Sequence, residues 1–293
     1  MVYNKKKISL FTILNTCFLV LSALLCIIPL IHIAAVSLSS STATSAGKVT
    51  LWPVEFSLNS YEYVAKRVAF WRSMFVSVER IVLGGALNLL LSILVAYPLS
   101  KENSEFRFRS FYAWAFFITM LFGGGLIPWY MVIKQMHLLD TIWALILPGA
   151  VPIFSVILLL NFFRQVPKEL SEAAFIDGAG HWTTLWNIYV PVSMPALATI
   201  LLFSLVAHWN SWFDGLILMN NPDNYPLQSY IQTIVVQRTY SMMSREEIQQ
   251  LATISDRTLR SSQIFLGSIP IILVYPFLQK YFVKGIVLGS VKG

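Results

Sequence analysis

The chain has 293 residues, of which 56% are hydrophobic and only 12% charged, and its formal net charge is +7. Soluble domains carry about 25% charged and about 45–50% apolar residues, so this composition excludes an ordinary soluble protein and favours a membrane protein. The basic residues form no stripe with interleaved aromatics, which argues against nucleic acid as a partner. They fall between long apolar runs, where positive charge fixes the orientation of a membrane protein.

Six apolar segments are long enough to cross a hydrocarbon core about 30 Å thick. The first could instead be a secretory signal peptide, because lysines precede it, but the apolar core of a signal peptide runs only about 7–15 residues. A retained first span is the better interpretation. The sequence therefore predicts an all-α polytopic protein whose residues 1–293 form a single transmembrane domain. The predicted spans cover about residues 10–38, 73–99, 111–132, 142–163, 190–219 and 262–282.

Lysines and arginines are denser in the N-terminus and in residues 101–109, 164–189 and 279–293 than in the other connections. The positive-inside rule therefore predicts that both termini lie in the cytoplasm. Two outer loops, residues 39–72 and 220–261, are too long for simple turns. Within the second, we expect a short helix over Ser244–Ala252 with Ser244 as its N-cap.

The connection between the fourth and fifth spans predicts a helix–turn–helix. Pro167 begins a short helix, and Gly178 offers the left-handed position that ends one. A second short helix follows, and Pro191 opens the fifth span, where proline is favoured in the first turn. Ala173 and Ala174 form a small-residue side that another protein can approach closely, although an amphipathic helix that only stiffens the loop is the alternative. We expect the apolar side chains to pack on the chain's own bundle; these are Phe175, Ile176, Trp182 and Trp186.

The same connection resembles the EAA loop of bacterial ABC importer permeases. The similar residues are Glu172-Ala173-Ala174, Gly178, Ile188 and Val190-Pro191. Three residues separate Ala174 from Gly178, nine separate Gly178 from Ile188, and one separates Ile188 from Val190. Val190 stands where the pattern usually has leucine. Asp177-Gly178-Ala179 and Pro195 are similar to the carbohydrate-uptake, maltose-type branch. Further similar stretches cover nearly the whole chain, and they look closest to permeases of aldouronate and alginate importers. These stretches are residues 122–128, 209–213, 225–228 and 275–282.

This resemblance implies the type I ABC importer permease fold in a bacterial inner membrane, with residues 164–189 as the cytoplasmic coupling loop. It implies import of an oligosaccharide by alternating access, and an acidic one such as an alginate or aldouronate oligosaccharide is the best guess. The implied partners are a second, non-identical permease, two ATP-hydrolysing subunits, an extracytoplasmic binding protein and the lipid membrane. The residues implied to contact the ATPase are Glu172, Ala173, Ala174, Phe175, Asp177, Gly178 and Ala179.

The chain contains no P-loop, so the usual device for ATP binding is missing. We therefore expect no cofactor on this chain, ATP–Mg on the partner ATPase, and no enzymatic activity of the chain itself. An ion-gradient-driven secondary transporter is the alternative, but it predicts inverted repeats and mid-membrane carboxylates, and we find neither in the sequence. A membrane-embedded enzyme would need a clustered acid, base or metal set, and the four histidines show no metal-ligand spacing.

A substrate passage is predicted near the outer end of the fifth span, at Trp209, Asn210, Trp212 and Asp214, beside His208. Aromatic faces suit the C–H surfaces of sugars, and amides and carboxylates suit their hydroxyls. The alternative is an interfacial belt of aromatic residues, which is enriched in tryptophan at this depth.

Two further features of the spans are a run of glycines in the third and two ionisable residues in the second. Residues Gly123–Gly125 permit close helix packing or a break in the third span, and we expect packing. Glu79 and Arg80 are ionisable residues in the second span, and such residues are functional candidates by default. Adjacent helical residues point about 100° apart, so these two are not expected to pair with each other, and a structural use is favoured.

Overall fold

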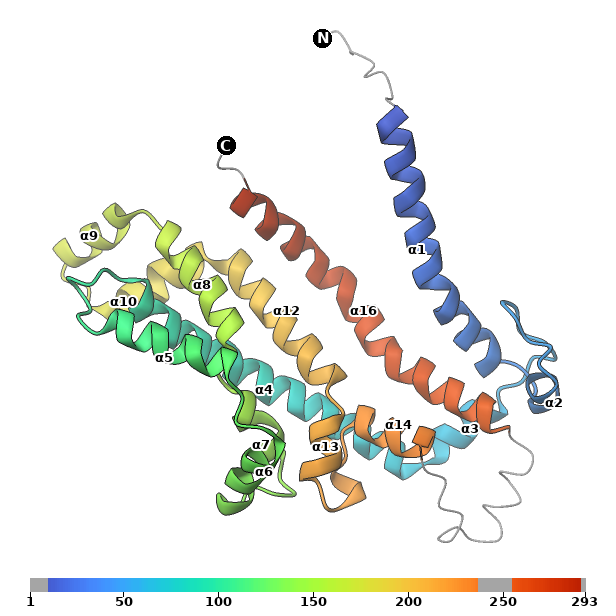
Figure 1. Ribbon diagram of the computed structural model, residues 1–293. Helices are drawn as coiled ribbons and strands as arrows, with labels where there is room; N and C mark the ends of the chain where they lie inside the picture. The colour runs from blue at the N-terminus through green and yellow to red at the C-terminus, as the bar shows by residue number, and fades with distance from the viewer. Residues whose placement is uncertain (1–9, 237–254, 291–293) are drawn as a thin grey trace. The chain divides into compact units, whose positions relative to one another are not determined.

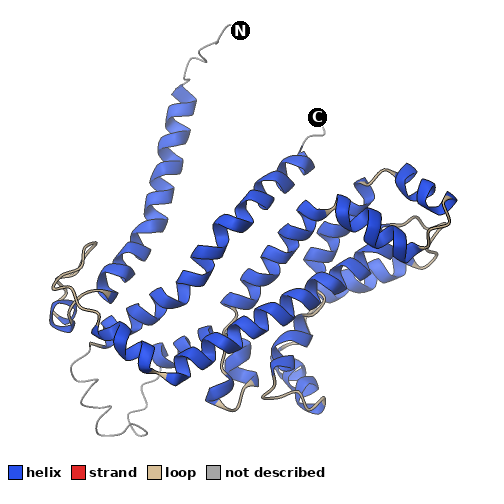
Figure 2. Ribbon diagram, turned by 180° about the vertical axis from the view of Figure 1, so that it is seen from behind, coloured by secondary structure: helices blue, strands red, loops and turns tan. Residues whose placement is uncertain are grey.

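A computed structural model describes residues 10–236 and 255–290, and over these ranges the protein is helical (Figure 2). The all-α prediction is therefore confirmed for the described chain, in which Ser39 and Phe56 form an isolated β-bridge. The helix predicted over Ser244–Ala252 and both chain termini lie outside the described residues. The chain divides into two units, one made of residues 1–68 and 233–269 and the other of residues 69–232 and 270–293.

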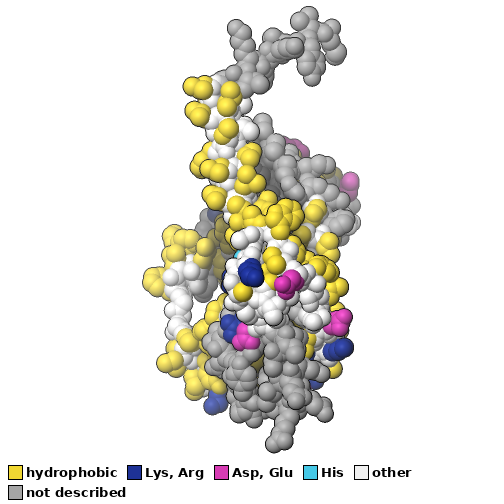
Figure 3. All heavy atoms as spheres, turned by 90° about the vertical axis from the view of Figure 1, so that its right-hand side faces the viewer, with side chains coloured by type: hydrophobic (Ala, Val, Ile, Leu, Met, Phe, Trp, Pro, Cys, Tyr) yellow, Lys and Arg dark blue, Asp and Glu magenta, His cyan; other side chains and the backbone are white. Residues whose placement is uncertain are grey.

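The first unit carries the long helix α1 (Leu10–Ser37), whose side chains are exposed along most of its length. Hydrophobic side chains cover this helix in Figure 3, as expected of a helix that faces lipid. The residues after α1 fold into two short helices, α2 (Ser41–Ser45) and α3 (Asn59–Lys66). The hydroxyl of Ser40 caps α2 and also donates to the carboxylate of Glu55 at 2.5 Å. The predicted outer loop 39–72 is therefore an ordered element.

The second unit is built around α4 (Val68–Ser100), α8 (Ile153–Gln165) and α12 (Met194–Asn210), which lie together in Figure 1. Their shared core is apolar, and it also takes in the turn of π-helix at Leu185–Tyr189. This packing supplies the rigid frame on which the sites described below are built. Buried side chains of this core include Ile93, Ala96, Val156, Leu159, Phe163, Leu185, Leu197 and Ile200.

The predicted third span is divided into α5 (Arg109–Leu121) and α6 (Leu126–Gln135), which are bent by 115°. The backbone leaves the helical region at Phe122, and Gly125 adopts a φ of +86°. A Cβ added at Gly123 or Gly124 would meet no atom within 4 Å, so no helix packs closely against them. The structure thus shows a break here, in place of the close helix packing that we expected.

The fourth and fifth predicted spans are also bent. The fourth consists of α7 (Ile142–Ile146), a 3₁₀ turn (Leu147–Gly149) and α8, with a bend of 48° in a stretch that contains two prolines. The fifth begins at Met194 rather than at Pro191, because segment His181–Val192 meets α12 at 82°. After α12, the chain continues through α13 (Phe213–Leu218), a 3₁₀ turn (Pro222–Asn224) and α14 (Leu227–Val236).

The predicted sixth span falls inside α16 (Asp256–Ser290), which crosses the division between the two units at Pro270. Within the described residues, α1 and α4 are each long and apolar enough to cross a membrane alone. Each of the three bent pairs meets the same condition when its two helices are taken together.

Candidate functional site

The predicted coupling loop folds around the short helix α9 (Lys168–Ile176), with Pro167 at its N-cap position as expected. Gly178 has a φ of +83°, which ends the helix in a Schellman motif. Its N–H donates to the carbonyl of Phe175 at 3.1 Å, and the N–H of Ala179 donates to the carbonyl of Ala174 at 2.9 Å. A Cβ at Gly178 would meet no atom within 4 Å, so the glycine is required by the backbone conformation and not by crowding.

One face of α9 is open to solvent. Glu169, Glu172, Ala173 and Ile176 follow helical spacing along it and are all exposed, while Ala174 is half-buried. Ile176 is the most open of them, with 85% of its surface exposed. Trp182 in α10 (His181–Thr184) is likewise exposed. The packing that we expected is therefore not formed by these two residues, and Phe175 and Trp186 are only partly packed, at 38% and 39% exposed.

The opposite side of α9 is held by a buried lysine at the end of α4. The ammonium of Lys101 lies 4.8 Å from the ring of Tyr97, 4.7 Å from that of Tyr189 and 6.0 Å from that of Phe175. It donates a hydrogen bond to the Tyr189 hydroxyl at 3.1 Å and lies 3.8 Å from the carboxylate of Glu105. Lysines are rarely buried unless paired, and cations are attracted to aromatic faces. Lys101 therefore joins α4, α9 and the π-helical turn.

Sequence reasoning treated Lys101 only as one of the charges that orient the protein. Tyr97 could have indicated an aromatic contact for Lys101, because it lies four residues earlier on the same helix face. His181 lies beside Tyr97 and Phe175: its Nδ1 is 3.3 Å from the Tyr97 hydroxyl, and its ring is edge-to-face with that of Phe175.

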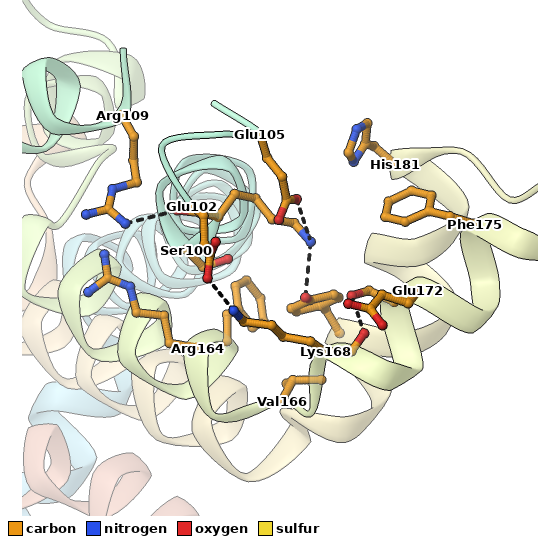
Figure 4. Close-up of a pocket in the computed structure, with 14 residues that line it drawn as sticks. Ser100, Glu102, Glu105, Arg109, Arg164, Val166, Lys168, Glu172, Phe175 and His181 are labelled. Carbon is orange, nitrogen blue, oxygen red and sulfur yellow. Dashed lines mark hydrogen bonds and ion pairs between the residues drawn. The ribbon is translucent and has the colours of Figure 1, made fainter. Parts of the chain in front are cut away.

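A pocket of about 690 Å³ lies between the end of α4 and α9, and its wall includes Lys101, Phe175 and His181 (Figure 4). Lys168 at the start of α9 donates to the carboxylate of Glu102 just beyond α4. This bond, together with the lysine charge, holds the pKa of Glu102 below its usual value and raises the pKa of Lys168. The coupling loop is thus fastened to α4 by one buried cation and one exposed ion pair.

A second polar group lies inside the bundle, at Arg80 of α4. Its side chain is 3% exposed, and its guanidinium binds both carboxylate oxygens of Asp214 in α13, with Nη1 to Oδ1 at 3.2 Å. Nη2 also donates to the carbonyl of Leu145 in α7 at 3.4 Å, and Nε donates to Nδ1 of His208 in α12 at 3.3 Å. The guanidinium therefore links α4 to α7, α12 and α13. The carboxylate that it binds belongs to Asp214 and not to the neighbouring Glu79.

His208 extends this network. Because its Nδ1 accepts from Arg80, the ring hydrogen lies on Nε2, which donates to the side-chain oxygen of Asn88 at 3.2 Å. The same oxygen accepts from the hydroxyl of Ser204 at 2.8 Å, and the amide nitrogen donates to backbone carbonyls, including that of Gly84 at 3.1 Å. A Cβ at Gly84 would lie 2.5 Å from Nε2 of His208, so only glycine leaves room for the ring. The network is thus built into the packing of α4 on α12.

A cavity of about 490 Å³ opens beside this network. Its wall combines aromatic rings with hydroxyl, amide, imidazole and carboxylate groups. Ligand sites of about 300–1,000 Å³ with apolar walls and a few placed polar groups are typical of small-molecule binding. The aromatic members are Trp129, Phe154 and Phe203, and the polar members are Arg80, Asn88, Ser155, Ser204, His208, Ser211 and Asp214.

The structure brings Asp214 of the predicted passage to this cavity, but not the other three residues. Trp209 is buried and borders a separate apolar cavity of about 120 Å³. Asn210 ends α12 and is exposed, and Trp212 is 41% exposed with its ring edge-on to Phe213. From the sequence, His208 was named beside the passage and Arg80 as an ionisable candidate, but Asn88 was missed, although an amide in an apolar span was a usable signal.

Comparison with known proteins gives consistent results. Residues 73–288 match the protein family described as binding-protein-dependent transport system inner membrane component. The polygalacturonan/rhamnogalacturonan transport system permease protein YtcP of Bacillus subtilis (strain 168) is 38% identical over 284 residues, which cover 97% of this chain and 99% of that protein. Protein LplC of the same organism is 36% identical over 291 residues, covering 99% of this chain and 98% of that protein.

A solved structure is also similar along the whole chain. It is described as a bacterial ABC transporter involved in the import of the acidic polysaccharide alginate. The matching chain is 31% identical, the TM-score is 0.85, and the alignment covers 96% of this chain and 100% of that chain.

Proposed function

The chain belongs to the family of inner-membrane components of binding-protein-dependent transport systems, and from this premise we propose that it is the permease subunit of an ATP-driven oligosaccharide importer. In ABC importers ATP is hydrolysed by partner subunits, so the chain itself is a transport component of the inner membrane and not an enzyme. The observation that carries the oligosaccharide assignment is whole-chain similarity to proteins described as handling polysaccharides.

An acidic oligosaccharide is the proposed substrate. Alginate is described as acidic, and polygalacturonan is a polymer of a uronic acid, so both descriptions name carboxylate-bearing sugars. The cavity beside Arg80 supports a saccharide, because Phe154 and Phe203 offer aromatic faces while Ser155 and Asp214 offer hydrogen-bonding groups. We propose this cavity as part of the passage, with Asp214 as the predicted passage residue on its wall and Trp209, Asn210 and Trp212 outside it.

The helix α9 is the proposed coupling element, lying on the cytoplasmic side with both chain termini. Its exposed face, with Glu172, Ala173 and Ile176, suits a groove on an ATP-hydrolysing subunit that holds ATP–Mg. Asp177, Gly178 and Ala179 fix the end of the helix, and Ala174 lies beneath it. Phe175 points inward to Lys101, so a movement of α9 is transmitted to α4 as a displacement of a packed rigid element.

The remaining proposed partners follow from the family. A second, non-identical permease completes the passage, two ATPase subunits engage the coupling loops, and an extracytoplasmic binding protein delivers the oligosaccharide to the outer loops 39–72 and 220–261. The ordered helices α2 and α3 give the first of these loops a defined surface for that encounter.

The test is transport by the assembled importer in proteoliposomes. Uptake of uronate oligosaccharides should require ATP and the binding protein and should persist when an uncoupler collapses ion gradients. Neutral maltooligosaccharides of the same length should neither be taken up nor stimulate the ATPase. Uptake that continues without ATP and stops with the uncoupler would identify a secondary transporter instead. Stimulation by the neutral sugars alone would contradict the acidic substrate while leaving the importer assignment in place.

A further inference from the structure

Two arginines lie next to each other on one side of the pocket beside α9, as Figure 4 shows for Arg109 and Arg164. Arg109 is the first residue of α5, and Arg164 lies in the last turn of α8. The charge of Arg109 acts on Arg164 directly. Two like charges held this close repel each other unless an anion lies between or beside them.

Both guanidiniums have hydrogen-bonding capacity to spare. Nη1 of Arg109 donates to the carbonyl of Lys101 at 3.0 Å, and Nη2 of Arg164 donates to the carbonyl of Leu99 at 3.4 Å. Both carbonyls lie at the C-terminal end of α4, so the two arginine side chains cap that helix. A guanidinium has five N–H donors, however, and each arginine spends only one in this way. Nε of Arg109 is buried with no hydrogen-bond partner.

The nearby carboxylates offset the two arginines only in part, although the charge of Arg109 does act on Glu102. Glu102 is bound by Lys168, and Glu105 lies beside Lys101. Among the residues that the structure describes, neither Arg109 nor Arg164 forms an ion pair. The wall of the pocket carries four cations, Lys101, Arg109, Arg164 and Lys168, against the three carboxylates of Glu102, Glu105 and Glu172, so one positive charge is in excess.

The position of the two arginines corresponds to the depth of lipid headgroups. Arg109 is the first residue of the apolar helix α5, and Arg164 immediately follows the apolar run of α8, against which α5 packs. Phe108 and Phe111, at the same start of α5, are 62% and 70% exposed. Aromatic side chains gather where a membrane meets water, and long basic side chains reach the same layer.

We propose that Arg109 and Arg164 bind the phosphate group of an anionic phospholipid. Arginine pairs suit phosphate because the planar guanidinium donates two parallel hydrogen bonds to its oxygens. The N-terminus of α5 adds a positive helix end at the same place. A lipid bound here also braces the end of α4, because both arginines hold its last carbonyls.

The experiment measures lipid retention by the purified, complete importer complex, using native mass spectrometry after reconstitution in nanodiscs. Discs of phosphatidylglycerol mixed with phosphatidylcholine are compared with discs of phosphatidylcholine alone. The wild-type complex should retain phosphatidylglycerol, and the variant R109Q/R164Q should retain at least about tenfold less. Arg107→Gln is the matched control, because Arg107 lies in the same loop, is exposed and does not border the pocket. The control should retain the lipid as the wild type does.

Three outcomes would overturn the proposal. Equal retention by the wild type and R109Q/R164Q would show that the arginines do not hold the lipid. Displacement of phosphatidylglycerol by added inorganic phosphate, with equal ATPase activity in both states, would identify free phosphate as the ligand. Loss of the ATPase subunits from R109Q/R164Q with unchanged lipid retention would show that the arginines face a protein partner.

If R109Q/R164Q fails to assemble, Arg109→Gln and Arg164→Gln are measured separately. Each should lower retention, and unchanged retention in both would count against the site. The lipid-retention measurements themselves require neither sugar nor ATP turnover, so their result is independent of the proposed transport function.

Discussion

Arg80 of α4 and Asp214 of α13 form a two-point ion pair inside the bundle, although 134 residues separate them in the sequence. Arg80 is almost fully buried and Asp214 only 18% exposed. The carboxylate also accepts from the hydroxyl of Ser211 at 2.7 Å and from the backbone N–H of Gly215 at 2.9 Å. The pair thus holds the segment after the fifth span against the second span.

Removal of one member of this pair should be strongly destabilising. In Asp214→Ala, the buried charge of Arg80 loses its partner, and changes of this kind cost about 3–5 kcal/mol. Thermal unfolding of the detergent-solubilised complex checks this. Arg80→Met combined with Asp214→Ala should be more stable than Asp214→Ala alone, because no buried charge is left. Equal stability of Asp214→Ala and the wild type would show that the ion pair contributes nothing.

Gly84→Ala should disturb the network around His208. The new methyl group would lie 2.5 Å from Nε2 of His208, so the ring must move away from Asn88. Overpacking of this kind costs about 1–3 kcal/mol. The melting temperature of the complex should fall for Gly84→Ala and stay unchanged for the control Gly123→Ala, whose methyl group would meet no atom. Equal effects of the two variants would contradict the crowded site.

Gly178→Ala should weaken the coupling of ATP hydrolysis to transport. A non-glycine residue at a φ of +83° costs roughly 1–2 kcal/mol, which frays the end of α9 that carries the proposed docking face. The measurement is ATPase stimulation by the sugar-loaded binding protein, with membrane insertion checked separately. Gly180→Ala is the control, because Gly180 lies two residues away in an extended conformation. If the two variants stimulate the ATPase equally, the helix end does not govern coupling.

Lys101→Met should keep the complex assembled but reduce the ATP-dependent uptake. Methionine fills a similar space among Tyr97, Phe175 and Tyr189 but lacks the charge that is attracted to their rings. Lys101→Arg keeps that charge and should retain more uptake than Lys101→Met. The ratio of sugar transported to ATP hydrolysed is the measurement. A ratio unchanged in Lys101→Met would show that α9 is linked to α4 by other contacts.

Phe203→Ala should weaken recognition of the oligosaccharide. It removes one aromatic face from the cavity beside Arg80, so the half-saturating sugar concentration for uptake should rise about tenfold, as expected for the loss of one stacking contact. Phe117→Ala is the control, because Phe117 is 38% exposed, much like Phe203 at 37%, but lies on α5 away from the cavity. A similar rise in both variants would argue against a specific sugar contact.

The sequence predicts the features that depend on local chemistry. The bounds of α1 and the end of α4 follow from the length of apolar runs, although α4 begins five residues before the predicted start at residue 73. Pro167 and Gly178 mark the ends of α9 through their backbone preferences. The bends in the third, fourth and fifth spans were not predicted as such. An average of hydrophobicity over a window does not register one glycine or proline that turns the chain.

The polar interior could not be predicted, because its partners meet only through the fold. Arg80 stands beside Glu79 in the sequence, yet its carboxylate comes from Asp214. Trp209 and Asp214 lie close together in the chain, but the helix end at Asn210 separates them, so one is packed in an apolar core and the other borders the cavity. Neighbours in sequence were therefore a poor guide to neighbours in the site.

The open side of α9 has a consequence for how the subunit is made. Ile176 and Trp182 present apolar surface to water while the chain stands alone. Such surface on a newly made subunit is what chaperones and proteases bind, so an unassembled copy should be short-lived in the cell. If the proposed ATPase partner covers α9, the abundance of this chain should follow the supply of that partner, and co-production of the subunits becomes a condition for obtaining the chain intact.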